Sequence, residues 1–187
     1  MKWLPKILLI SFSVILLVYM LWPWGSRVIS DFPNLPNSAK STLDGDTVQV
    51  PNVAGYFSRN YRDIVIPFYH NEYQLQTKLP FAPLKLIHPP EFAFVAIKEQ
   101  TQSTYLEELV YPLRDSLYIN GMEPIGKDGE QLFAGAAEFG FEGILYPVKT
   151  TIRFYPSSYA VRILVWAGIV TSVILLWKVG RKVLTNA

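Results

Sequence analysis

The sequence predicts a membrane protein in which two transmembrane α-helices flank an extracytoplasmic α+β domain with a mostly antiparallel sheet. Two apolar runs, residues 7–22 and 159–177, lie near the ends of the 187-residue chain. The residues between them are numerous enough to bury one core. Helix-like and strand-like patterns both occur in that middle part, which indicates mixed secondary structure.

The distribution of charge gives the predicted orientation. The middle of the chain, from Arg27 to Arg153, holds all 15 acidic residues but only 11 of the 17 basic ones, a net charge of −4. Lys2 and Lys6 precede the first apolar run, and three further basic residues follow the second. Basic residues beside a membrane span favour the cytoplasmic face. An acidic middle domain argues against nucleic acid as a partner, because phosphate binding needs clustered Lys and Arg.

The first apolar run is interpreted as an uncleaved signal anchor. Residues 1–6 are expected to form a short cytoplasmic tail and residues 7–24 the first transmembrane helix. The twenty residues from Trp3 to Trp22 are enough for one helix to cross ~30 Å of hydrocarbon. A cleaved signal peptide is the alternative, but it needs small residues before the cleavage site. Trp22 and Trp24 stand there instead, and tryptophan suits the bilayer interface. The absence of cysteine excludes disulfides and thiolate metal sites, and it favours a prokaryotic source.

Residues 25–52 are predicted to be a stalk or irregular lead-in, because they contain three prolines and several Ser and Asn. One short strand is expected at about Thr47 to Val50. The folded domain is then expected to span residues 53–158.

Within the domain, apolar spacing from Tyr61 to Tyr69 predicts a helix that kinks at Pro67, with a strand over residues 62–68 as the alternative. Strands are expected over residues 84–88 and 92–98, joined by a proline turn. Residues 103–118 are predicted to form a capped helix that Pro112 bends and that ends at Asn120-Gly121. Strands over residues 142–147 and 148–155 are expected to close one sheet, with the helices packed on one face.

The second apolar run predicts a transmembrane helix over residues 159–177, with a cytoplasmic tail over residues 178–187. Arg162 lies near its outer end, where a long cationic side chain can reach the headgroups. Four small residues are spaced so that another helix can approach closely: Ala167, Gly168, Thr171 and Ser172. The first span, a second copy of the chain and a partner subunit are the candidates for that helix.

Four residues are the candidate metal ligands. The chain has two histidines, and each lies near a carboxylate, as His70 with Glu72 and His88 with Glu91. Two histidines and two carboxylates are the ligand types of a hydrolytic metal site. Their spacing matches no metal motif, and both pairs adjoin predicted turns, where polar residues are common anyway. No motif identifies catalytic residues, and no cofactor is expected.

The leading functional hypothesis is a non-catalytic, membrane-anchored accessory or structural subunit that presents an extracytoplasmic interaction domain in a cell-envelope assembly. Anchoring both ends of a domain fixes its height above the bilayer, which suits such a role. A membrane-anchored hydrolase using His70 and His88 is the first alternative, and a membrane sensor or binding module is the second. We expect the chain in the cytoplasmic (inner) membrane, with both termini cytoplasmic and residues 25–158 outside.

Overall fold

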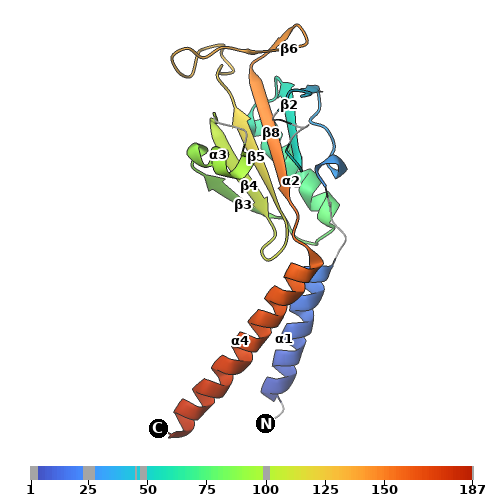
Figure 1. Ribbon diagram of the computed structural model, residues 1–187, viewed down its shortest axis with the longest axis vertical. Helices are drawn as coiled ribbons and strands as arrows, with labels where there is room; N and C mark the ends of the chain where they lie inside the picture. Colours follow the sequence, from blue (N-terminus) through green and yellow to red (C-terminus); the bar gives the residue numbers. More distant parts are fainter. Residues whose placement is uncertain (1–3, 23–27, 45, 47–49, 99–101, 187) are drawn as a thin grey trace. The chain divides into compact units, whose positions relative to one another are not determined.

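The computed structural model describes residues 4–22, 28–44, 46, 50–98 and 102–186, which fall into two compact units. Residues 25–156 form one unit, and the two terminal segments form the other. The first unit is an α+β domain, as predicted, and its main sheet is antiparallel throughout (Figure 1). From one edge to the other the six strands are β1 (Ser38–Lys40), β2 (Val53–Ser58), β8 (Val148–Tyr155), β5 (Ser116–Met122), β4 (Tyr105–Val110) and β3 (Leu84–His88).

Strand β8 is confirmed where the alternation predicted it, and it pairs with β2 and β5 in the interior of the sheet. Its even-numbered residues face one side and its odd-numbered residues the other. Ile152 and Phe154 are buried on the first side, and Thr151 and Arg153 on the second. Both faces of the sheet are therefore covered, so the predicted half-buried strand is instead an interior one.

Helix α2 (Arg62–Thr77) covers the even-numbered face of β8. It buries Val65, Ile66, Tyr69 and Tyr73, and Phe32 packs between the rings of Tyr73 and Phe154. The predicted helix is confirmed and the alternative strand is wrong, whereas the kink at Pro67 stays a prediction. Pro67 lies inside the helix but on its exposed side, where water can bond to the carbonyl group that loses its partner. The helix ends where Lys78 adopts a left-handed conformation, with φ of 53°.

Helix α3 (Ala93–Ile97) covers the opposite face, so the prediction that the helices pack on one face is wrong. A 3-10 turn, η2 (Pro90–Phe92), leads into it. The predicted strand over residues 92–98 is also wrong. Ala93 and Ile97 are buried one helical turn apart, whereas Phe94 and Val95 are exposed. An apolar run this short fits either structure, because its periodicity cannot distinguish them.

The predicted capped helix over residues 103–118 is wrong, because this segment forms most of the β4–β5 hairpin. The chain reverses at Tyr111–Asp115, where the Arg114 N–H donates to the Tyr111 carbonyl and Leu113 has a φ of 64°. Pro112, expected to bend a helix, stands in this turn. Strand β4 is buried on both faces apart from its last residue, so it lacks the alternation that identifies a half-buried strand.

The last predicted strand pair is also corrected. Within residues 142–147 only β7 (Ile144–Tyr146) is a strand, and it pairs with β6 (Phe139–Phe141) rather than with β8. Glu142 and Gly143 form the two-residue turn, both with positive φ, as a type I′ hairpin requires. The Phe57 ring of β2 stacks on Phe141 at 4.7 Å and joins this hairpin to the main sheet.

The lead-in over residues 25–52 contributes to the domain. A 3-10 turn, η1 (Ile29–Asp31), precedes the buried Phe32 and Leu35, and β1 pairs with β2. Residues 47–49 of the strand expected over residues 47–50 lie outside the described residues, and Val50 is in a bend.

The terminal unit consists of α1 (Leu4–Leu21) and α4 (Tyr159–Asn186), which contact each other. In the part of the chain that the structure describes, α4 is the one helix long and apolar enough to cross a membrane. Helix α1 contributes a shorter apolar stretch, Lys6–Leu21. The two-span arrangement therefore stays a prediction.

Polar side chains of α4 link the two helices. Arg162 is buried and donates to the Met20 carbonyl at 2.9 Å and to the Ser157 hydroxyl at 2.8 Å. The Trp166 indole N–H donates to the Ser13 carbonyl at 2.9 Å. Arg162 and Trp166 are therefore hydrogen-bonded within the helix pair.

Candidate functional site

The structure separates the two histidines. His70 and Glu72 lie on α2, which covers one face of the sheet. His88 is the last residue of β3, and its side chain belongs to the opposite face, where its ring stacks on Tyr118. Among the described residues, no group of three or more His, Cys, Asp or Glu side chains is placed to hold a metal ion.

The partner of His88 is Glu108, which the sequence analysis did not single out. The imidazole Nε2 lies 2.8 Å from the Glu108 carboxylate, and the His88 and Tyr118 rings stack at 5.7 Å. Glu108 pairs across β4 and β5 with Tyr118. The pKa of Tyr118 is raised to about 12. Burial is the largest cause, and the negative charge of Glu108 and a hydrogen bond to Glu108 add to it. Tyr118 therefore remains a hydrogen-bond donor at neutral pH.

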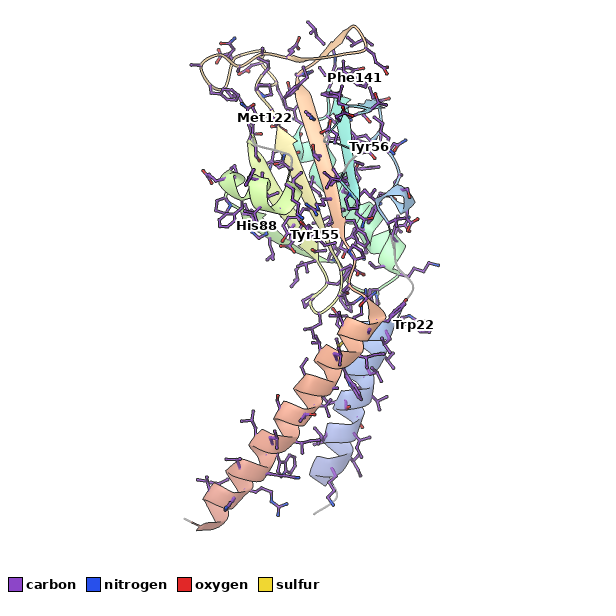
Figure 2. The ribbon with its side chains drawn as sticks, in the orientation of Figure 1. Trp22, Tyr56, His88, Met122, Phe141 and Tyr155 are labelled. Atoms are coloured by element: carbon purple, nitrogen blue, oxygen red, sulfur yellow. The ribbon has the colours of Figure 1, made fainter. Side chains whose placement is uncertain are left out.

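His88 and Tyr118 line the His88 pocket, a hollow of about 530 Å³. Its walls are mostly apolar and aromatic, and its lining residues are His88, Phe92, Val95, Ala96, Leu106, Ser116, Tyr118 and Tyr155. Figure 2 labels His88 and Tyr155 on this part of the domain. Apolar walls with a few polar groups are typical of small-molecule pockets. Because Nε2 is bonded to a carboxylate, the imidazole keeps its other nitrogen as an acceptor when neutral.

Two residues of β8 fix α3 against the sheet and so shape this pocket. The Tyr155 hydroxyl donates to the Ala96 carbonyl at 2.6 Å, and Arg153 donates to the same carbonyl at 3.3 Å. The Arg153 guanidinium also lies over the Tyr155 ring, 4.5 Å from its centroid. The wall formed by α3 is therefore held by two hydrogen bonds as well as by apolar packing.

An exposed apolar surface adjoins the His88 pocket. Among the described strands β3 is an edge of the sheet, and it pairs with β4 on one side only. We call this the β3 surface, and its exposed residues are Leu84 and Leu86 on the His88 side of β3, Ile87 on the other side of that strand, and Phe92, Phe94 and Val95 of the η2–α3 segment. Exposed edges pair readily with other strands, and contiguous apolar patches mark interaction sites.

A second pocket, of about 670 Å³, lies on the α2 face and is charged. We call it the Glu107 pocket, and its lining residues are Tyr61, Arg62, Asp63, Ile66, Pro67, Lys85, Glu107, Glu123, Gly126 and Lys127. Asp63, Glu107 and Glu123 oppose Arg62, Lys85 and Lys127, so the pocket carries charges of both signs in equal number.

Glu107 is the buried centre of this pocket. Its side chain is 1% exposed, and its Oε1 accepts from both Nε and Nη2 of Arg62 at 2.6 Å. Its Oε2 has no hydrogen-bond partner among the described residues, since the Lys85 ammonium stands 3.6 Å away. The Arg62 guanidinium also lies over the Tyr105 ring, 5.3 Å from its centroid.

The remaining two carboxylates differ in environment. Asp63 pairs with Lys127 at 2.6 Å, and that hydrogen bond lowers the pKa of Asp63. Glu123 accepts the backbone N–H of Arg62 at 2.6 Å. Burial nevertheless raises the pKa of Glu123, because the loss of water outweighs that bond and the nearby cations.

Sequence reasoning located His88 but neither of its partners. The sequence predicts Glu107 and Glu108 in a helix. In the strand that they actually form, the two side chains face opposite sides of the sheet. The available signal was Pro112 in the middle of the apparent helix, which is more typical of a turn between strands.

No protein-family model, curated protein or solved structure matches this chain. The candidate sites therefore rest on the geometry of this chain alone.

Proposed function

We propose that this protein is a non-catalytic, membrane-anchored accessory subunit that presents its α+β domain to a partner protein in a cell-envelope assembly. In this proposal both α1 and α4 span the cytoplasmic membrane, both termini are cytoplasmic and residues 25–158 are outside. The partner supplies an extended segment that adds to the edge of the sheet at β3.

The observation that carries the proposal is the β3 surface. Its exposed residues come from the open edge strand and from the η2–α3 segment beside it. An edge strand offers a row of unpaired backbone N–H and C=O groups. Only another extended polypeptide can form hydrogen bonds with all of them in order along the strand. Pro83 and Pro89 bracket β3 and lack N–H groups, so they limit such pairing to the five residues between them. An apolar extended segment is therefore the partner that this edge suits best.

The helix pair supports membrane anchoring. Most of the large apolar side chains described on α1 and α4 are exposed, which suits contact with a lipid bilayer. Arg162 and Trp166 bond within the pair, so the cost of placing them near hydrocarbon is reduced. Gly168, Thr171 and Ser172 are also exposed, which leaves that side of α4 open to a further helix.

Topology can be tested with single cysteines, because the chain has none of its own. Intact cells carrying Leu132→Cys or Lys182→Cys are treated with a membrane-impermeant maleimide. Leu132→Cys, in the domain, should be labelled at once, and Lys182→Cys only after the cells are permeabilised. Labelling in the reverse order would overturn the proposed orientation.

The interaction is tested by photo-crosslinking in cells from a reactive residue at position 87, with position 40 on the opposite edge strand as its control. A protein adduct is expected from position 87 and should disappear when Leu86→Asp is added. The matched change Leu75→Asp, at an exposed leucine of α2, should leave the adduct unchanged. An adduct between two copies of this chain, or equal adducts from both edges, would contradict a separate partner at β3.

A further inference from the structure

We propose that the Glu107 pocket binds a small zwitterion with its ammonium and carboxylate groups on neighbouring carbon atoms, which is the chemistry of a free α-amino acid. This pocket lies on the opposite face of the sheet from the His88 pocket. The proposal is independent of the partner-binding function.

The first argument is the unpartnered oxygen of Glu107. A carboxylate that is 1% exposed normally satisfies both oxygens, but here Arg62 bonds twice to Oε1 and no described residue bonds to Oε2. The site thus lacks one strong hydrogen-bond donor. An ammonium group supplies such a donor together with a compensating charge.

The second argument is the charge that remains after the close pairs are formed. Arg62 is bonded to Glu107, and Lys127 is bonded to Asp63. Lys85 has only its 3.6 Å approach to Glu107, and Glu123 has a backbone N–H as its direct partner. Within the described part of the chain, Lys85 and Glu123 therefore lack a close ionic partner.

Charge balance then selects the ligand class. A simple anion would face three carboxylates, and a simple cation would leave Lys85 without a partner. A zwitterion can lie head to tail against the Lys85–Glu107 pair, with its ammonium towards Glu107 and Glu123 and its carboxylate towards Lys85. The two protein charges start 3.6 Å apart on neighbouring strands, so a ligand with its two charges close together bridges them with the smallest movement of Lys85.

Access to Glu107 requires movement of Lys85. The Oε2 atom is closed to solvent, whereas the Lys85 side chain is 47% exposed and can rotate outward. Arg62 is less free, since it is bonded to Glu107 and stacks on Tyr105. Lys85 therefore moves to take the ligand carboxylate, while the Arg62–Glu107 pair stays in place.

The test is calorimetric titration of the full chain in detergent with five probes: glycine, L-leucine, γ-aminobutyrate, ethylamine and acetate. Glycine and L-leucine should bind. The other three should bind at least about tenfold more weakly, because each lacks one charge or holds its charges too far apart. Binding of acetate or ethylamine as tight as that of glycine, or no binding of glycine at about 10 mM, would overturn the proposal.

Variants connect the binding to this pocket. Lys85→Met and Glu107→Gln should each weaken glycine binding by about tenfold or more, since each removes one charge-assisted contact. Lys40→Met and Glu91→Gln, at exposed positions outside the pocket, should leave the affinity unchanged. If Glu107→Gln impairs folding, Lys85→Met decides the question, and an unchanged affinity in that variant would refute the assignment.

Discussion

Replacing Gly121 with alanine should destabilise the domain, because the new methyl group would occupy the place of the Tyr105 ring. Gly121 of β5 pairs directly with Tyr105 of β4. A Cβ atom at position 121 would lie 2.0 Å from Cε1 and 2.1 Å from Cζ of that ring. Tyr105 is 4% exposed, so its ring can leave only by displacing its neighbours.

The magnitude follows from the contacts that must change. Gly121 has no positive φ, so alanine adds no backbone strain, and the whole cost comes from the ring. Overpacking a filled core costs about 1–3 kcal/mol. Displacing the ring also weakens its contact with the Arg62 guanidinium, worth about 0.5–1 kcal/mol. We expect Gly121→Ala to lower the free energy of unfolding by about 2–3 kcal/mol.

Urea unfolding followed by near-ultraviolet circular dichroism of tyrosine is the suitable assay, because all five tryptophans lie outside residues 25–156. Gly140→Ala is the matched control, since its Cβ would meet nothing closer than 3.9 Å and should change stability by less than about 0.5 kcal/mol.

A double-mutant cycle tests the cause of the effect. In a Tyr105→Ala background, Gly121→Ala should cost less than about 0.5 kcal/mol, which gives a coupling energy of about 2 kcal/mol. Equal costs in the two backgrounds would show that the ring is not responsible. A cost no larger than that of Gly140→Ala would refute the packing argument itself.

Two further predictions concern the pockets. Arg62→Met should cost about 3 kcal/mol of unfolding free energy, because it leaves the buried Glu107 carboxylate without its main partner. Glu107→Gln should cost clearly less, because the Arg62 side chain is 45% exposed and water can hydrate it. Urea midpoints in the reverse order would contradict this reasoning. The pKa of Tyr118 is raised from 10.0 to about 12, so the folded state retains the proton longer than the unfolded state does. The corresponding stabilisation is complete below pH 10 and is lost as the pH rises to about 12. Tyr118→Phe should therefore reduce the slope of unfolding free energy against pH in that window, and an unchanged slope would count against the burial of Tyr118 beside Glu108.

Elements with a clear local pattern could be predicted from the sequence. Strand β8 alternates in residue type, β3 is short and bounded by prolines, and α2 repeats apolar residues at helical spacing. In each case the residues that define the pattern lie within one element, so no information about distant parts of the chain was needed.

The β4–β5 hairpin could not be predicted in this way, because the reasons for its conformation are distant in sequence. Glu107 and Glu108 resemble the charged side of a helix until their partners are known. Those partners are Arg62, 45 residues earlier, and His88, 20 residues earlier. Two consecutive glutamates can be buried only when each carboxylate has its own cation or hydrogen-bond donor. The fold of the sheet, and not the local sequence, places Arg62 beside Glu107 and His88 beside Glu108.

The same limit applies to the candidate sites. His88 attracted attention because histidine is rare in this chain, but a rare residue does not identify its partner. The sequence paired it with Glu91, which is near in the chain. In the structure the β3–β4 register sets His88 opposite Leu106, and its side chain reaches diagonally to Glu108, two residues further along β4 on the same face. The Glu107 pocket had no sequence signal, because its charged residues come from α2, β3, β4 and the loop after β5.

Strand alternation connects the two pockets. Glu107 and Glu108 are consecutive, so one faces the α2 side of the sheet and the other the α3 side. Strand β3 contributes a partner to each, Lys85 to Glu107 and His88 to Glu108. A polypeptide that added to the β3 edge would contact the strand that positions both partners. If an α-amino acid draws Lys85 away from Glu107, the two binding events act on the same five-residue strand. Any effect of the amino acid on partner affinity must then be matched by an equal effect of the partner on amino-acid affinity, because coupling between two binding equilibria is reciprocal.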